Sequence, residues 1–116
     1  MENLLVELRS IHDLNEALQE SYERPVLLFK HSLTCPISTC ALNQLESHLS
    51  KADTEARYRL IRIQKAYDVS NEVASRLRVV HESPQAILVR DGREVWNASH
   101  YDITASSLEE AISSTR

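Results

Sequence analysis

The chain has 116 residues, of which 13 are Lys or Arg and 17 are Asp or Glu, so its formal charge is −4. That length predicts one domain, residues 1–116, which can fold around its own core without a disulfide or a metal. The acidic balance argues against nucleic acid as a partner, and no apolar run reaches the roughly 20 residues that cross a membrane.

The first half of the chain predicts two strands and two helices in alternation. Residues 4–8 form a short apolar run that we expect to be a strand, and the apolar spacing over residues 11–23 is that of a helix. The continuous apolar run at residues 26–29 is typical of a strand buried on both faces of a sheet. Apolar residues then recur on one helical face over residues 36–52, which predicts a second helix.

The second half of the chain continues this alternation. Residues 58–64 are rich in β-formers and predict a third strand. Residues 71–78 carry the apolar stripe of a short helix, and Thr104 is a suitable N-cap for a last helix. No repeat, low-complexity segment or long linker interrupts these elements.

A β-hairpin is predicted between the last two helices. Residues 86–90 and 93–97 flank Asp91-Gly92, the strongest short-range hairpin signal in the sequence. Gly92 is the only glycine, which excludes the glycine-rich loops that bind nucleotides. Strands that alternate with helices predict a parallel core sheet, to which the hairpin adds antiparallel strands at one edge. The expected fold is therefore α/β and thioredoxin-like: a central mixed sheet of four to five strands with helices on both faces.

The N-terminus and the cysteine content predict a compartment. Glu2 stands where a secretion signal would carry positive charge, and no long apolar segment follows, so the expected location is the cytoplasm. Thiols stay reduced there, which favours chemistry or packing over a structural disulfide for the two cysteines, Cys35 and Cys40.

A chemically reactive segment is predicted where the second strand meets the second helix. Cys35 lies at this junction, and the next residue is Pro36, which is favoured at the first helical position. Unpaired backbone N–H groups and the positive end of the helix dipole stabilise a thiolate there. Because the thiolate is the nucleophile of disulfide exchange, we interpret Cys35 as catalytic. The alternative is a cysteine that only packs or caps the helix.

The position three residues after Cys35 distinguishes this segment from a C-x-x-C motif. It holds Ser38, which cannot form a disulfide but whose hydroxyl is expected to donate a hydrogen bond to the Cys35 thiolate. The alternative is an ordinary exposed serine in the first helical turn. The chemistry implied is monothiol exchange, in which Cys35 carries a mixed disulfide that an external thiol resolves.

Cys40 lies further along the same predicted helix. A spacing of five residues gives a Cα separation from Cys35 of about 8–9 Å, beyond the roughly 7 Å limit for a disulfide without backbone movement. Cys40 is therefore expected to be a small, semi-buried helix residue. The alternative is an unusual resolving cysteine, which Cys35 would reach if the first helical turn unwound.

Four residues are candidates for binding the substrate. In a thioredoxin-like fold, Pro84 falls in the loop that faces the nucleophile, where a cis peptide bond lets Ser83 pair with an extended substrate segment. A trans proline that merely starts a strand is the alternative. Lys30 and His31 precede Cys35 and either stabilise its thiolate, hold an acidic substrate group or have structural roles. The five histidines and two cysteines lack metal-ligand spacing, so no metal site is expected.

Three segments resemble a known family. They are FKHSLTCPIS, RVVHESPQAILVRDGREVW and ASHYDIT, and they are similar to the YtxJ family of thioredoxin-like proteins, the monothiol bacilliredoxins. The resemblance implies removal of bacillithiol from S-thiolated client proteins, with bacillithiol or a related small thiol as co-substrate and no tightly bound cofactor. It matches the family's active cysteine to Cys35, its serine to Ser38 and its cis-proline to Pro84. A cysteine at position 40 departs from the family's typical pattern.

Two other functions are compatible with the same residues. A redox-sensing or binding module would be modified at Cys35 without turnover, and steady-state turnover of a bacillithiolated protein distinguishes it from an enzyme. A thiol peroxidase would use Cys35 and Cys40. The peroxiredoxin pattern P-x-x-x-T-x-x-C is absent, however, because Leu28 and Ser32 stand at its Pro and Thr positions.

Overall fold

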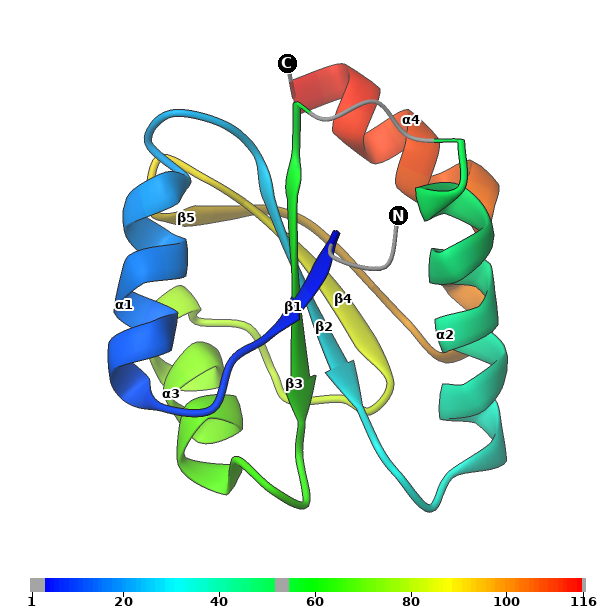
Figure 1. Ribbon diagram of the computed structural model, residues 1–116, viewed down its shortest axis with the longest axis horizontal. Helices are drawn as coiled ribbons and strands as arrows, with labels where there is room; N and C mark the ends of the chain where they lie inside the picture. The colour runs from blue at the N-terminus through cyan, green and yellow to red at the C-terminus, as the bar shows by residue number, and fades with distance from the viewer. Residues whose placement is uncertain (1–3, 52–54, 116) are drawn as a thin grey trace.

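A five-stranded sheet forms the centre of the computed structural model, which describes residues 4–51 and 55–115 (Figure 1). The strands are β1 (Leu5–Glu7), β2 (Val26–His31), β3 (Arg57–Arg62), β4 (Gln85–Arg90) and β5 (Arg93–Ser99). They lie in the order β1-β3-β2-β4-β5. Strands β1, β3 and β2 are parallel, whereas β4 runs antiparallel to β2 and β5 runs antiparallel to β4. The predicted parallel core with a hairpin at one edge is confirmed.

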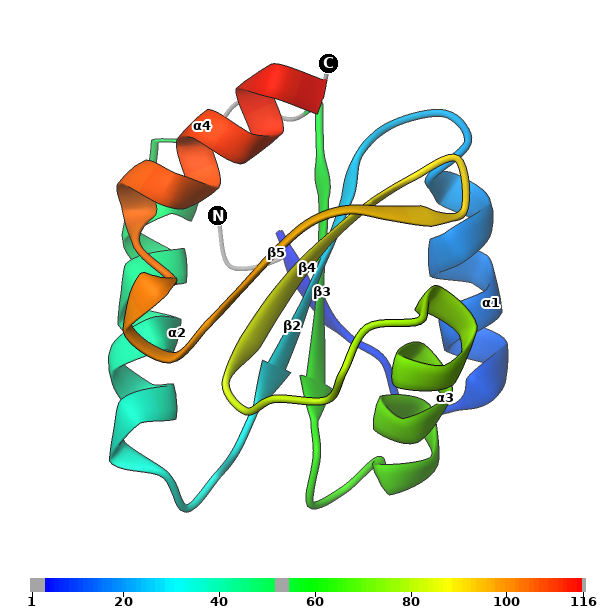
Figure 2. The same cartoon turned by 180° about the vertical axis from the view of Figure 1, so that it is seen from behind.

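Helices cover both faces of this sheet (Figures 1 and 2). They are α1 (Ile11–Glu20), α2 (Pro36–Leu49), α3 (Tyr67–Leu77), the 3-10 helix η1 (His100–Asp102) and α4 (Ala105–Thr115). One hydrophobic cluster joins α1 and α3 to the sheet, and a second joins α2 and α4 to its other face. The predicted thioredoxin-like α/β architecture is therefore confirmed. None of the helices within the described ranges is long and apolar enough to cross a membrane.

Strand β2 lies in the middle of the sheet and leads the chain to Cys35. All six of its residues are buried, Lys30 included. Because side chains alternate across a strand, Leu28 and Lys30 face α1 and α3, whereas Phe29 and His31 face α2 and α4. The strand therefore extends two residues beyond the predicted 26–29, with buried polar side chains at its end.

The predicted hairpin turn explains the position of the only glycine. Asp91 and Gly92 have φ angles of 56° and 76°, as a tight two-residue hairpin turn requires. The N–H of Gly92 donates to Oγ of Ser21 (2.8 Å), just beyond the end of α1. A Cβ on Gly92 would lie 2.7 Å from the hydroxyl of Tyr22. The positive φ of Gly92 therefore favours glycine, and a Cβ there would also displace the exposed Tyr22 side chain.

Helix α3 is longer than predicted. It begins at Tyr67, four residues before the predicted range 71–78, because Val69 continues the buried stripe of the helix. No side chain caps its start, so the sequence carried no capping signal there. The helix ends at Leu77 because Arg78 adopts a left-handed conformation (φ 58°).

Two other helices are shorter than predicted. Helix α1 ends at Glu20, because the N–H of Ser21 donates to the carbonyl three residues back, at Leu18, and turns follow to residue 23. Helix α2 ends at Leu49; Ala52, the last residue of the predicted helix, lies outside the described residues. Strand boundaries shift by one or two residues, which changes neither their order nor their pairing.

Three connecting segments meet at one end of the central strands. Strands β2 and β3 finish at this end and β4 begins there, at the lower side of Figure 1. Residues 32–35, 63–66 and 78–84 therefore lie together. This arrangement brings Cys35 and Pro84, which are distant in the sequence, to the same end of the molecule.

Candidate active site

Cys35 occupies the N-cap position of α2. Its backbone is extended (φ −109°, ψ 119°), and Pro36 takes the first helical position, where no N–H is needed. The carbonyl of Cys35 accepts the N–H groups of Ser38 (3.0 Å) and Thr39 (3.2 Å), which starts the helix. The thiol is free and half-buried, so a disulfide can reach it at the positive end of α2.

An open hollow lies beside Cys35. Its volume is about 410 Å³, and it is lined by Leu33, Thr34, Cys35, Pro36 and Thr39. None of these side chains apart from the thiol is titratable. The hollow therefore offers a nucleophile surrounded by small polar and apolar groups, with no fixed charge in its wall.

The peptide bond between Ser83 and Pro84 is cis, as predicted. Lys30 pairs with Gln85 across β2 and β4, so Pro84, one residue earlier, lies at the end of β2. The hydroxyl of Ser83 is buried and has no hydrogen-bond partner among the described residues. The cis-proline segment is thus beside the turn that carries Cys35, with one polar group still unsatisfied.

The hydroxyl of Ser38 has partners other than the expected one. Ser38 is fully buried, its Oγ accepts the N–H of Ser32 (2.9 Å), and Nδ1 of His31 lies 2.7 Å away. Within the described residues, the Ser38 side chain forms no hydrogen bond with Cys35. The predicted thiolate contact and the exposed-serine alternative are both wrong, because Ser38 lies on the inward face of α2 and ties that helix to the end of β2.

Lys30 and His31 lie inside the protein. Burial, and secondly the charge of Arg62, lowers the pKa of His31, so its ring is mainly neutral at pH 7. Nζ of Lys30 lies 3.1 Å from Nδ1 of His81, and burial lowers the pKa of Lys30 to about 8. Because both side chains are buried, neither offers an exposed cation to an acidic substrate group, and the structure corrects that expectation: their contacts are with His81 and Ser38.

Cys40 is exposed on α2, not semi-buried as predicted. The burial prediction was wrong because position 40 faces away from the apolar stripe of α2, which is formed by Ala41, Leu45 and Leu49. The first turn of the helix is intact, and both cysteines are free thiols.

Sequence reasoning missed Gln64. This residue lies just beyond β3, and its Oε1 accepts the N–H of Leu33 (3.0 Å) while its Nε2 donates to Oγ of Ser32 (2.9 Å). The available signal was its place in the chain: a long polar side chain directly after β3 can reach the segment that follows the neighbouring strand β2.

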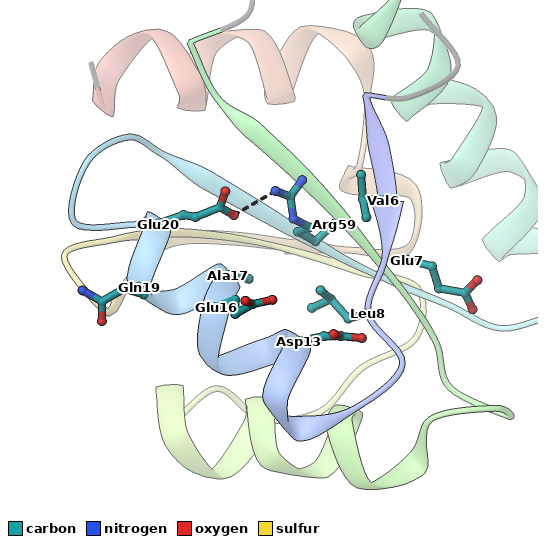
Figure 3. A pocket seen from close by; sticks show the side chains of 9 residues that line it. All are labelled: Val6, Glu7, Leu8, Asp13, Glu16, Ala17, Gln19, Glu20 and Arg59. Atoms are coloured by element: carbon teal, nitrogen blue, oxygen red, sulfur yellow. Dashed lines mark hydrogen bonds and ion pairs between the residues drawn. The ribbon is translucent and has the colours of Figure 1, made fainter.

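A larger hollow, of about 480 Å³, lies between β1 and α1 (Figure 3). It is lined by Val6, Glu7, Leu8, Asp13, Glu16, Ala17, Gln19, Glu20 and Arg59. Arg59 pairs with Glu20 (2.8 Å) across it, and its lining has no thiol or imidazole. Within residues 4–51 and 55–115, no three His, Cys, Asp or Glu side chains come together as a metal site.

Known proteins similar to this chain share its fold. The family described as monothiol bacilliredoxin BrxC matches residues 6–108. A solved thioredoxin-fold protein, provisionally assigned as an oxidoreductase, has 35% sequence identity and a TM-score of 0.84, and the match covers 95% of each chain. Fasciola hepatica thioredoxin has 19% identity and a TM-score of 0.75, covering 96% of this chain and 99% of its own. Malassezia sympodialis thioredoxin has 12% identity and a TM-score of 0.77, covering 96% and 90%. These two thioredoxins show the fold alone, whereas the family match shows that this chain belongs to the monothiol bacilliredoxins, which are thioredoxin-fold oxidoreductases.

Proposed function

We propose that this protein removes bacillithiol, or a related low-molecular-weight thiol, from mixed disulfides on client proteins by exchange at Cys35. The observation that carries the proposal is the placement of Cys35. It is a free, half-buried thiol at the start of α2, it lines an open hollow, and it lies at the same end of the central strands as cis-Pro84. A monothiol cycle fits Ser38, which stands where a C-x-x-C enzyme has its second cysteine.

The reaction consists of two exchange steps. The Cys35 thiolate attacks the bacillithiol sulfur of the mixed disulfide; a bond forms between Cys35 and bacillithiol, and the bond from bacillithiol to the client breaks. The client sulfur leaves as a thiolate and takes a proton from solvent. The thiolate of a second small thiol then attacks the bacillithiol sulfur on Cys35, so a small-molecule disulfide leaves and the Cys35 thiolate is restored. The client disulfide is thus reduced, and the small thiol is oxidised.

Ser83 and Pro84 are proposed to bind the client. A cis-proline segment can pair with an extended chain as an added strand does. The backbone N–H and C=O of Ser83, next to the cis bond, are the groups proposed to pair with that chain. The proposed cycle requires no metal or tightly bound cofactor. Its proposed compartment is the cytoplasm, where cells keep protein thiols reduced.

The test uses a purified protein that carries a bacillithiol mixed disulfide. Release of its thiol is followed with the wild type, Cys35→Ser and Cys40→Ser, in the presence of free bacillithiol. Cys35→Ser should lose at least about 10³-fold in rate, because the nucleophile is gone, whereas Cys40→Ser should stay within about twofold. Mass spectrometry should find one bacillithiol adduct, on Cys35.

Two results contradict the proposal. Modification of Cys35 without turnover by the wild type indicates a redox-sensing module. A disulfide between Cys35 and Cys40, together with loss of turnover in Cys40→Ser, contradicts the monothiol cycle and identifies Cys40 as a resolving cysteine.

A further inference from the structure

The turn between β2 and Cys35 is held from two sides. On its inner side, Oγ of Ser38 accepts the N–H of Ser32 (2.9 Å). On its outer side, the Gln64 amide contacts all three residues of the turn. Oε1 accepts the N–H of Leu33 (3.0 Å), and Nε2 donates to Oγ of Ser32 (2.9 Å) and lies 3.5 Å from Oγ1 of Thr34. One distant side chain, that of Gln64, therefore contacts each of the three residues before Cys35.

The backbone around Gln64 is anchored beside this turn. The N–H of Ile63 donates to the carbonyl of His31 (3.0 Å), which extends the pairing of β2 and β3 by one residue. Gln64 itself is exposed, and a glutamine side chain in water loses conformational freedom when it is fixed. Both ends of its amide are nevertheless engaged with residues 32–34. This arrangement fixes the turn relative to β3.

We propose that Gln64 is a positioning residue for exchange at Cys35, an inference that rests on the function proposed above. Its amide holds residues 32–34 so that Cys35 lines the open hollow at a fixed angle. Attack on a disulfide needs the nucleophilic sulfur close to the line of the S–S bond, and a misplacement of about 1 Å can lower a rate about 100-fold. Gln64 does not touch the reacting sulfur and acts only through the turn.

The test substitutes Gln64→Met, which keeps the length of the side chain and removes both hydrogen-bonding atoms. The matched control is Gln44→Met on α2, because Oε1 of Gln44 also accepts a backbone N–H, that of Ala105 (2.9 Å). Two rates are measured for each protein, together with the melting temperature. One is alkylation of Cys35 by iodoacetamide as a function of pH, and the other is exchange with a protein mixed disulfide.

Exchange by Gln64→Met should be about tenfold slower than in the wild type. Its alkylation rate, the pH profile of that rate and its melting temperature should stay close to wild type, because a small reagent reports the thiolate and not its alignment. Gln44→Met should leave both rates within about twofold.

A conservative variant sharpens the test. Gln64→Glu keeps an oxygen acceptor for the N–H of Leu33 and replaces the Nε2 donor by a second oxygen, to which the Ser32 hydroxyl can donate instead. It also adds a negative charge near Cys35. We expect its alkylation profile to move to higher pH, since a nearby negative charge disfavours the thiolate. Its exchange rate at the high-pH plateau should return toward wild type.

Three outcomes overturn the inference. Wild-type exchange by Gln64→Met shows that the turn does not need the amide. Parallel losses of exchange, alkylation and melting temperature show a structural role only. If the wild type itself exchanges with no protein mixed disulfide, the proposed function fails, and with it the reaction that Gln64 would serve; this result is distinct from a failure limited to the variant.

Discussion

The hollow between β1 and α1 and the hollow beside Cys35 differ in both size and chemistry. The larger, about 480 Å³, lies between β1 and α1 and is lined by carboxylates and Arg59. Its charges have partners: Glu20 pairs with Arg59 (2.8 Å), and Glu7 pairs with Arg62 (3.4 Å). The smaller, about 410 Å³, surrounds Cys35 with uncharged side chains. The reactive group lies in the smaller hollow, so volume alone does not locate the site.

The difference extends to the polar groups near each hollow. Behind Cys35, Ser38, His31 and Lys30 are buried and hydrogen-bonded to other side chains. The carboxylate of the Glu20–Arg59 pair is by contrast partly exposed. Losing a buried polar contact leaves a partner without a hydrogen bond, which costs more than losing an exposed ion pair. Substitutions at the two hollows should therefore differ in their effects on both activity and stability.

Filling each hollow with a tryptophan side chain should give the largest difference in exchange rate between the two hollows. Thr39→Trp, from an exposed position on α2, covers Cys35 and should slow exchange with a protein mixed disulfide on the order of 100-fold, because the disulfide can no longer align. Gln19→Trp fills the other hollow from an exposed position on α1 and should change the rate less than about twofold. Release of the client thiol measures both. A greater loss with Gln19→Trp would assign substrate binding to the larger hollow.

Removing the hydroxyl of Ser38 should give the largest change in stability. Ser38→Ala leaves the N–H of Ser32 and Nδ1 of His31 without their buried partner. We expect the free energy of unfolding to fall by about 2–3 kcal/mol, measured by urea denaturation. Ser47→Ala, at an exposed position of the same helix, is the control and should stay within about 0.5 kcal/mol. Equal effects of the two substitutions would show that the buried contact contributes little.

Much of the fold could be predicted because its signals are local. The apolar run at 26–29, the pair Asp91-Gly92 and Pro36 after Cys35 each depend on neighbours in the sequence. The order of the elements then placed the hairpin at a sheet edge and Cys35 at a helix start. The predicted range for α3 began four residues too late, because no capping side chain marks the start of this helix.

The side-chain partners at the site could not be predicted, because they join segments that are distant in the chain. Gln64 bonds Ser32 across 32 positions, and Lys30 bonds His81 across 51. The spacing that suggested a bond from Ser38 to Cys35 considered α2 alone. That spacing carried no information on the end of β2, where His31 and Ser32 form hydrogen bonds with the Ser38 hydroxyl.

Lys30 should make the stability of the protein depend on pH. Burial lowers the pKa of Lys30 from 10.5 to about 8, so between these values the unfolded chain binds more protons than the folded one. Stability contributed by this group therefore rises as pH increases from about 8 towards 10.5. Across that pH range, the free energy of unfolding of the wild type should rise by on the order of 1–2 kcal/mol relative to that of Lys30→Met. Urea unfolding near pH 7 and near pH 10 measures the gain, and a difference that is independent of pH would contradict it.

The ion pair of the larger hollow should show the smallest effect. The side chain of Glu20 is 38% exposed and that of Arg59 is 13% exposed, so water and side-chain entropy offset much of their attraction. Glu20→Gln keeps the shape and an oxygen acceptor for Arg59, and it should lower the free energy of unfolding by less than about 1 kcal/mol. Added salt should reduce that difference, because mobile ions screen an exposed pair. Urea unfolding at low and high salt measures both effects. A salt-independent loss as large as that of Ser38→Ala would place a strongly coupled charge pair in this hollow, and the contrast between the two regions would then rest on the thiol alone.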